Sequence, residues 1–535
     1  MIAEVPNARR FEDVLRRRRR LIFALVGIAA PLFGILAGIL AENGQTMSLA
    51  LVLLLLAPIV AWWRLPVAVL GLFFVGVVIE QFHIGVNAQD VTESIPLFTS
   101  LNSGVGISGV YFNPMELVMI SIVVVILLRM GLRQATMPRS ALFYTLLVLL
   151  ALVVFGAIHG LATHSAFKEV IDEVRPLCYL AMMYFLVSQL PAKTSSLVAL
   201  LWTFIGIIAV RSLQGTILVF TSVLGKSTHP DYLLSHEDSL FLSVFLAFVA
   251  ALWLFERRGR MRRVATLIAP FAFLVEIANN RRAGWLMLGA SLLVLLLFAA
   301  VRLPQRRRLV LTIVTVMVVG FAVYMPIFWN HDQGLFGEPA RAVRSEIAPD
   351  ARDLASDLYR QGENIDLGFD IKSTPILGSG YGIAIPHVIP IVNLSPIDPS
   401  INFVPHDTIL YIWYRLGSFG ALAFWSLIGF AIVATCRLLR STDLDVSLYA
   451  TFAVMAVISY VAEGYVDLGL AFYRIAVFVG AAMGGLEVAR RVQLQIDADT
   501  AEQEAVIAEG RSPKRKRRPP VRTGAARRPQ TAGLR

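Results

Sequence analysis

The sequence is poor in charged residues. Only 16% of its 535 residues are Asp, Glu, Lys or Arg, whereas soluble globular domains contain about 25%. The deficit extends along almost the whole chain, because uncharged apolar runs of about 17–21 residues recur, and a helix of that length crosses a bilayer core of about 30 Å. This composition excludes a soluble globular protein and predicts a polytopic membrane protein.

Cysteine is scarce, and the sequence shows no metal-binding or nucleotide-binding pattern. Its two cysteines, Cys178 and Cys436, lie in or beside apolar segments, so no disulfide framework is predicted. The eight histidines have no ligand spacing such as H-E-x-x-H, and we expect no metal and no cofactor. The segment "LGSGYG" (377–382) superficially suggests a nucleotide-binding loop. No strand–helix pattern flanks it, so a tight turn beside a site is the better interpretation.

The long apolar runs predict an all-α integral membrane protein with about fourteen transmembrane helices. Residues 21–41 are uncharged and follow the basic stretch Arg16–Arg20. This run is longer than the hydrophobic core of a cleavable signal peptide, which has about 7–15 residues, so it is expected to be the first span. The predicted spans are about 21–41, 46–63, 65–80, 114–128, 140–158, 176–190, 197–213, 237–255, 264–280, 283–301, 309–328, 418–436, 446–462 and 468–488.

The distribution of Lys and Arg predicts which loops face the cytoplasm. Cytoplasmic loops are enriched in basic residues, and every alternate loop is basic when the N-terminal residues 1–20 are placed inside. Both termini are then cytoplasmic, and the two longest loops, about 81–113 and 329–406, are extracytoplasmic. The larger loop precedes the twelfth span, and "EPARAVRSEIAPDARDLASDLYRQGENI" within it predicts one or two soluble helices.

The C-terminal region differs from the membrane domain, which is expected to cover residues 21–490. Residues 491–535 include "SPKRKRRPPVRTGAARRP", which is rich in Pro, Arg and Lys and predicts a disordered cytoplasmic tail. Basic residues near a membrane are attracted to anionic headgroups by about 1 kcal/mol each. Membrane lipids are therefore the expected partner of this tail, and nucleic acid is not.

Arginines also occur at or just inside the outer ends of predicted helices, where positive charge is unfavourable. Asp467 lies seven residues before Arg474, so an ion pair explains that arginine. The adjacent Arg281 and Arg282 are harder to neutralise, since Glu276 alone is close. A guanidinium group suits bidentate phosphate recognition, so these positions predict a site for the anionic head of a lipid-borne substrate. The arginines at or just inside outer helix ends are Arg175, Arg211, Arg281, Arg282, Arg415 and Arg474.

Within residues of about 140–440, three motifs resemble, in the same order, those of the bacterial O-antigen ligase and polysaccharide polymerase superfamily of polytopic membrane glycosyltransferases, and a fourth motif adds to the resemblance. "IDEVRPLCYL" resembles the arginine–proline start of a middle helix, and "NNRRAGWLML" resembles a short outer turn with an arginine. "STPILGSGYG" resembles a Pro-hydrophobic-hydrophobic-Gly-x-Gly signature, and "PHDTILYIWYRLGSFG" resembles the histidine signature that ends the large outer loop. The ordered set carries the resemblance, rather than any one motif.

The resemblance implies an enzyme of the bacterial inner membrane that acts in cell-envelope biogenesis. Members of the superfamily take a glycan from a polyprenyl diphosphate, typically undecaprenyl diphosphate, and transfer it to an acceptor hydroxyl on the extracytoplasmic face without a metal. The acceptor is the lipid A–core of lipopolysaccharide in ligases. In polymerases, including those for exopolysaccharides, it is another lipid-linked glycan. The sequence leaves ligase and polymerase activity equally open.

The resemblance also implies which residues hold the diphosphate. Arg282 falls on the turn arginine and Arg175 on the arginine that starts the middle helix, so both are expected to bind it. Arg281, which stands where the family has a small or hydroxyl residue, adds charge to this site. Arg211 is a supporting candidate at another outer helix end.

Two candidate catalytic residues end the large loop. His406 falls on the loop histidine of the family and is the expected general base, because histidine is the commonest general base near neutral pH. Direct attack by the acceptor would invert the anomeric centre while arginines stabilise the leaving diphosphate. Asp407, where asparagine is common in the family, is a second catalytic candidate or the N-cap of the following helix. Arg415 shares a helical stripe with Asp407 and would contact the diphosphate or pair with Asp407.

Two other classes of function remain open. A flippase or transporter of lipid-linked glycans also needs many helices and intramembrane cations. It would not need a long outer loop that ends in a histidine, and no internal repeat marks two halves. A non-catalytic assembly protein would not need arginines at several outer helix ends. The expected partners are therefore a polyprenyl-diphosphate-linked glycan donor and a glycan or lipid acceptor.

Overall fold

The regular structure of the described chain is entirely helical. The computed structural model describes residues 47–81, 91–105, 109–223, 233–331, 337–392 and 399–508. These residues contain no strand, and nine of their helices are long and apolar enough to cross a membrane. The chain is therefore an all-α integral membrane protein, as its composition predicts. The predicted N-terminal segment 1–20, the first span 21–41 and the end of the tail, 509–535, lie outside the described residues.

The helices follow the apolar runs of the sequence, because these runs can satisfy their backbone hydrogen bonds within lipid only as helices. The nine candidate spans do not include α6, α9 and α16, so the number fourteen stays a prediction. In chain order, the helices are α2 (Met47–Val78), α3 (Leu101–Val105), α4 (Pro114–Gly131), α5 (Ala141–Ala162), α6 (Phe167–Ser188), α7 (Thr194–Leu218), α8 (His236–Leu254), α9 (Arg260–Ala278), α10 (Arg282–Arg302), α11 (Arg307–Phe328), α12 (Glu338–Ile347), α13 (Ala351–Ser373), α14 (Thr408–Leu438), α15 (Leu444–Val466) and α16 (Tyr473–Ala508).

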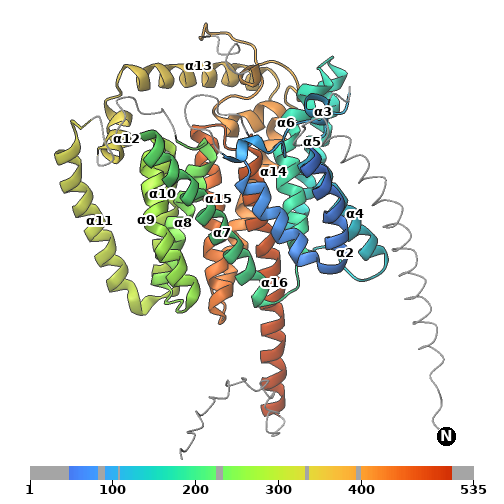
Figure 1. Cartoon of the computed structure of the whole chain (residues 1–535), viewed down its shortest axis with the longest axis vertical. Helices are drawn as coiled ribbons and strands as arrows, with labels where there is room; N and C mark the ends of the chain where they lie inside the picture. The colour runs from blue at the N-terminus through green and yellow to red at the C-terminus, as the bar shows by residue number, and fades with distance from the viewer. Residues whose placement is uncertain are drawn as a thin grey trace, which may run out of the picture.

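Two of these helices are interrupted by a non-helical residue. In α2 this residue is Arg64, with φ −142° and ψ 63°, and Figure 1 shows two blue arms that form a V at this helix. Pro66 has no N–H to continue the helical hydrogen bonds across the bend. In α14 the residue is Gly417, with φ 64° and ψ −166°. The helix therefore begins at Thr408, ten residues before the predicted span at 418, and its first part carries the aromatic residues of the histidine motif.

The centre of the bundle is formed by α8, α15 and the first half of α16. In α8 and α15, 83% and 78% of the most apolar stretch is buried. The same fraction is 11% for Pro304–Phe328, which contains α11 and lies at the edge of the molecule (Figure 1). Gly480 lets α16 approach α6, because a Cβ there would lie 2.4 Å from the carbonyl oxygen of Leu180. Gly484, one turn later, extends this close contact, which is common between membrane helices.

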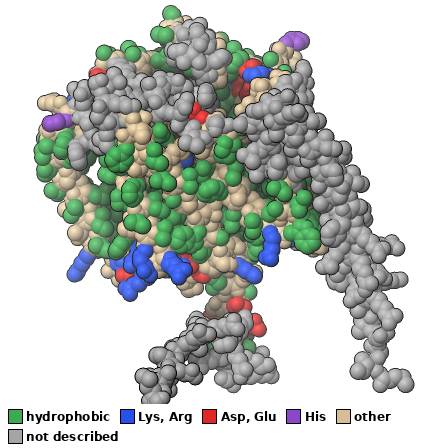
Figure 2. Space-filling model, in the orientation of Figure 1, with side chains coloured by type: hydrophobic (Ala, Val, Ile, Leu, Met, Phe, Trp, Pro, Cys, Tyr) green, Lys and Arg blue, Asp and Glu red, His purple; other side chains and the backbone are tan. Residues whose placement is uncertain are grey.

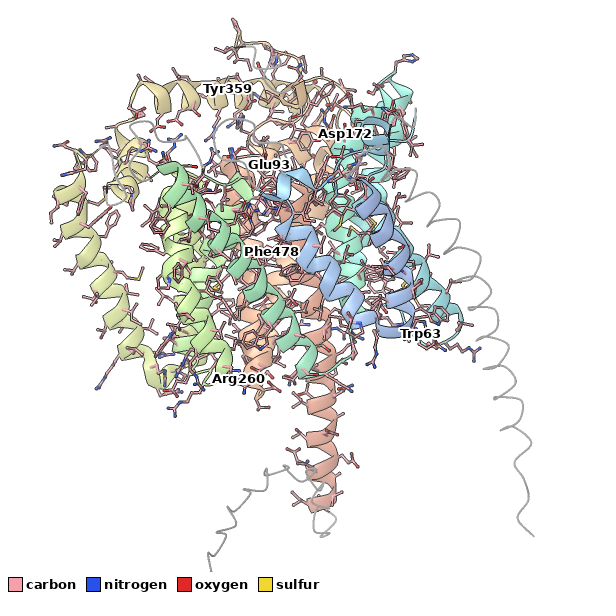
Figure 3. All side chains as sticks on the ribbon, in the orientation of Figure 1. Trp63, Glu93, Asp172, Arg260, Tyr359 and Phe478 are labelled. Carbon is pink, nitrogen blue, oxygen red and sulfur yellow. The ribbon has the colours of Figure 1, made fainter. Side chains whose placement is uncertain are left out.

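The two ends of the bundle differ in charge. Lys and Arg side chains gather at one end (Figure 2), where Arg260 and Trp63 also lie (Figure 3), and we call this the basic end. α13 lies across the opposite end (Figure 1), which also carries Tyr359 and Asp172 (Figure 3), and we call this the loop end. Hydrophobic side chains cover the surface between the two ends (Figure 2), as a protein embedded in lipid requires.

Helix α16 continues beyond the bundle at the basic end (Figure 1). It ends at Ala508, and its last buried residue is Val492. The predicted disorder from residue 491 is therefore wrong for residues 491–508. The stretch "QLQIDADTAEQEAVIA" is rich in Ala, Gln and Glu, which are strong helix formers. The Pro-rich and Arg-rich segment, on which the prediction of disorder depended, begins only after this stretch.

Candidate functional site

A cavity of about 780 Å³ lies at the loop end of the bundle. Its walls are the turn between α9 and α10, the helices α12 and α13, the start of α14 and the end of α15. His406, Asp407, Arg281 and Arg282 all line it. The structure thus brings together four of the seven site residues that the sequence predicts. They come from two distant parts of the chain, which are brought together only by the fold.

His406 is held by a buried carboxylate from α13. Its Nδ1 lies 2.8 Å from Oε2 of Glu363, its backbone N–H donates to the same oxygen, and Glu363 is 4% exposed. The ring of Tyr359 packs edge-on against the imidazole, with 5.7 Å between ring centroids. The Nε2 atom of His406 has no hydrogen-bond partner among the described residues. A histidine oriented in this way can accept a proton at Nε2 while the carboxylate stabilises the imidazolium.

Sequence reasoning did not identify Glu363. This residue lies 43 positions before His406, in a loop helix whose many charged residues give no single one a distinguishing pattern. The length of the loop was the one indication in the sequence that its residues belong to a site, because long loops with helices of their own are usually functional. Burial, together with the nearby Glu363 carboxylate, raises the pKa of Tyr359, so its hydroxyl stays protonated near neutral pH.

Asp407 caps the N-terminus of α14. Its Oδ1 accepts hydrogen bonds from the backbone N–H groups of Ile409 at 3.1 Å and Leu410 at 3.0 Å, so the predicted N-cap is confirmed. Burial raises the pKa of Asp407, although the two backbone hydrogen bonds oppose this effect. The side chain also lines the cavity, so a direct contact with a ligand stays a prediction for it.

Arg282 joins the bundle to the helices of the large loop. Its Nη2 lies 3.0 Å from Oδ1 of Asp357, and its Nε and Nη1 lie 4.0 Å and 3.6 Å from carboxylate oxygens of Asp353 and Glu346. Arg341, on α12, shares Asp353 at 3.3 Å. These ion pairs hold α12 and α13 over the start of α10. They also occupy the guanidinium group of Arg282, which the sequence assigns to a phosphate.

Arg281 and Arg360 also line the cavity. The charges of both act on Glu463, a buried carboxylate near the end of α15. The Nε atom of Arg360 is buried and has no hydrogen-bond partner in the described part of the chain. Arg360 is therefore a cation of the cavity with hydrogen-bonding capacity left for an anionic ligand. Arg360 carries no signal in the sequence because it belongs to loop helix α13, where a positive charge is not unfavourable as it is at the outer end of a membrane helix.

Carboxylates offset the arginines of the cavity. Asp467 accepts a hydrogen bond from Nδ1 of His236 at 2.7 Å. Burial alone would raise the pKa of Asp467, but the charge and hydrogen bond of His236, together with the charges of His406 and Arg360, outweigh burial and lower the pKa, so Asp467 is ionised. The cavity is thus suited to exchange one anion for another rather than to attract anions by net charge. Its charged lining in the described residues comprises four arginines, Arg281, Arg282, Arg341 and Arg360, and five carboxylates, Glu346, Asp353, Asp357, Asp407 and Asp467.

Three predicted diphosphate ligands do not line the cavity. Each of these arginines is buried and paired with a carboxylate from another helix. The sequence shows an arginine near a helix end but not the carboxylate that a distant helix brings to it. The predicted pair between Arg415 and Asp407 is also wrong, since Asp407 bonds to backbone N–H groups instead. The observed pairs are Arg175–Glu116, Arg211–Asp238 and Arg415–Glu173, each with a shortest N–O distance of 2.7 Å or less.

The sequence predicts an ion pair between Arg474 and Asp467, but the structure does not contain this pair. The guanidinium group of Arg474 instead contacts three carboxylates at 2.8–3.0 Å, and it shares two of them with Arg211. All these groups are 3% exposed or less and lie where α7, α8 and α16 meet the end of α2. We call these residues the charged cluster: Arg211, Arg474, Glu80, Glu237 and Asp238.

The cavity combines a histidine–glutamate pair, arginines within reach of an anion, and apolar or aromatic side chains such as Trp285, Leu286 and Tyr465. This combination, at the end of a membrane bundle, suits a substrate with a lipid part and an anionic part. Its function is inferred from these groups and from the four motifs, because no protein-family model matches the chain and no curated protein matches it.

Proposed function

We propose that the protein is a membrane glycosyltransferase of the O-antigen ligase or polymerase type. It transfers a glycan from a polyprenyl-diphosphate carrier to an acceptor hydroxyl. The observation that carries this proposal is the position of His406, backed by Glu363, in one cavity with Arg281, Arg282 and Arg360. A general base and anion-binding groups at the end of an apolar bundle are what a lipid-linked diphosphate donor requires.

In this proposal, the basic end of the bundle faces the cytoplasm, because cytoplasmic loops are enriched in Lys and Arg. The loop end and its cavity then lie on the extracytoplasmic face of a bacterial inner membrane, and both termini lie inside. Fourteen spans remain the proposed number, and nine helices of the described residues are long and apolar enough to supply nine of them.

The histidine acts as general base in the proposed reaction. Nε2 of His406 takes the proton of the acceptor hydroxyl while the hydroxyl oxygen attacks the anomeric carbon of the donor. A bond forms between these two atoms, and the bond from the anomeric carbon to the phosphate oxygen breaks. The electron pair leaves with the polyprenyl diphosphate, and the anomeric configuration inverts. Glu363 stabilises the imidazolium, as the carboxylate does in a catalytic triad.

The arginines stabilise the leaving diphosphate, whose charge increases as the bond breaks. Arg360 supplies the buried Nε described above. Arg282 becomes available when Glu346 and Asp357 turn away, and this is feasible because their side chains are 70% and 40% exposed. A charge-assisted bond to phosphate then replaces one to a carboxylate. Binding of the donor is therefore an exchange of anions on Arg282.

Deleting the gene and analysing the surface glycan tests the proposal. Single repeats on the acceptor, with loss of modal chain length, would indicate a polymerase. Free lipid-linked polymer with a bare acceptor would indicate a ligase. Purified full-length protein should then release polyprenyl diphosphate from the lipid-linked glycan that accumulates in the deletion strain. An unchanged surface glycan contradicts the proposal, and accumulation of the donor on the cytoplasmic leaflet indicates a flippase instead.

The variant Asp407→Asn distinguishes the cap from a catalytic carboxylate. Asparagine caps helices about as well as aspartate, and its Oδ1 can accept the same two backbone hydrogen bonds. We therefore expect Asp407→Asn to keep both the thermal midpoint and the transfer rate, whereas Asp407→Ala should lose about 1 kcal/mol of stability. Initial rates and thermal unfolding of the purified variants measure this. A loss of about 100-fold in rate for Asp407→Asn, at an unchanged midpoint, would instead make Asp407 a catalytic group.

A further inference from the structure

A second group of buried charges lies beside the cavity, around Glu173 of α6. Its Oε2 lies 2.7 Å from Nε of Arg415 in an ion pair and accepts a hydrogen bond from the hydroxyl of Tyr411 at 2.6 Å. Its Oε1 accepts from Nη2 of Arg415 at 3.1 Å and from the backbone N–H of Gly382 at 2.9 Å. Arg415 is fully buried and Glu173 is 6% exposed. One carboxylate thus joins α6, α14 and the glycine-rich turn at residues 378–382.

Arg415 extends these contacts to the segment that carries the histidine. Its Nη2 donates to the backbone carbonyl of Phe403 at 2.8 Å, and its Nη1 donates to that of Gly380 at 3.1 Å. The rings of Tyr411 and Tyr414 lie 5.3 Å and 4.7 Å from the guanidinium carbon. Both terminal nitrogens of the guanidinium group therefore donate to defined acceptors, and its orientation is fixed by several elements at once.

The glycine-rich turn is shaped to fit against Arg415, and it does not line the cavity. Gly378, Gly380 and Gly382 have φ values of 73°, 80° and 82°, in the left-handed region that favours glycine. A Cβ on Gly378 would lie 2.5 Å from the backbone of Arg415, and one on Gly380 would lie 2.7 Å from the backbone nitrogen of Gly160. This turn, where the sequence suggests a tight turn beside a site, therefore acts as packing around the Glu173–Arg415 pair.

We propose that Glu173 and Arg415 are positioning residues for His406. Arg415 fixes the Phe403 carbonyl three residues before the histidine, and Pro405 restricts the backbone between them. On the other side, the hydroxyl of Thr408 donates to the carbonyl of Gly464 at 3.0 Å. The backbone on both sides of His406 is thus held, and the direction of its Nε2 depends on the pair. The expected effect of the pair on the transfer rate rests on the proposed transferase function. Its expected effect on the order of residues 400–408 does not.

The double variant Glu173→Leu with Arg415→Met tests this role. It removes both charges together, and a buried pair replaced by apolar residues is often tolerated, whereas one partner left alone is not. We expect a thermal midpoint close to that of the native protein and faster amide hydrogen exchange in residues 400–408. With the donor extracted from the deletion strain, kcat should fall by about 100-fold at an unchanged KM, because displacement of a catalytic group by about 1 Å has that effect.

Two further variants complete the test. Arg415→Lys keeps the charge but not the fork of donors, so it should recover part of kcat and of the exchange protection. Arg437→Met removes an exposed arginine from the last turn of the same helix and should change neither quantity. Native exchange in residues 400–408 of the double variant, or native kcat despite faster exchange, overturns the inference. If the native protein transfers no glycan, the proposed function fails, and exchange alone decides whether the pair holds this segment.

Discussion

Replacing His406 with alanine is expected to reduce the rate of glycan transfer by about 10²–10⁴-fold, the usual contribution of a general base. Within the described part of the chain, the side chain forms no hydrogen bond other than that to Glu363, so the fold should persist. KM for the donor should change little, because the base acts on the acceptor in the transition state. Initial rates with the lipid-linked glycan from the deletion strain and full-length protein in detergent or nanodiscs measure both quantities.

The chain offers a matched control for this variant. His387 lies in the same loop and pairs through Nδ1 with a buried aspartate, Asp366, at 3.1 Å, but it does not line the cavity. His387→Ala should therefore leave the transfer rate near that of the native protein. Glu363→Gln should reduce the rate less than His406→Ala, because the imidazole remains but its cation is less stabilised. Less than about a tenfold loss for His406→Ala would exclude His406 as the base.

Replacing Arg474 with methionine is expected to destabilise the protein by about 3–5 kcal/mol, the usual effect of breaking a buried ion pair. Three buried carboxylates, Glu80, Glu237 and Asp238, would lose this partner, and two of them, Glu80 and Asp238, would depend more on Arg211. The thermal midpoint of the purified full-length protein should fall markedly, and less folded protein should reach the membrane. Both effects are independent of the proposed enzymatic function.

A second variant shows whether charge is the cause of this loss. Arg474→Met combined with Glu237→Leu removes one carboxylate together with the arginine and should recover part of the stability. Arg440→Met, at an exposed position, should stay within about 0.5 kcal/mol of the native protein. A native midpoint for Arg474→Met alone would contradict the view that the charged cluster stabilises the meeting point of these helices.

The positions of the membrane helices could be predicted from the sequence because hydrophobicity is a local property. An apolar run has no other way to satisfy its backbone in lipid than to form a helix, and the helices from α4 to α16, apart from the loop helices α12 and α13, lie where such runs occur. The helical end of α16 was missed because residues 491–508 are polar, and the basic residues that follow them dominated the prediction.

Residues of the candidate site could be predicted only where the local sequence around a single residue was enough to identify it. His406, Arg281 and Arg282 stand at helix boundaries, so local sequence was enough to select them. The partners of charged residues depend on tertiary contacts instead: Glu173 and Arg415 are 242 positions apart. No periodicity or spacing relates such residues. The sequence therefore identified arginines in unfavourable places but could not distinguish those with a carboxylate partner from those within reach of a ligand.

The length of α16 has a consequence for the basic sequence that follows it. From Val492, the last buried residue, to Ala508 the helix extends by 16 residues, which corresponds to about 24 Å at 1.5 Å per residue. The surface potential of anionic lipids decays over a Debye length of about 8 Å at physiological salt. If the helix stands along the bundle, as in Figure 1, it is a spacer that places the end of the ordered chain about three Debye lengths from the bundle. A basic side chain at the end of α16 would therefore feel little of the surface potential of the headgroups beside the bundle.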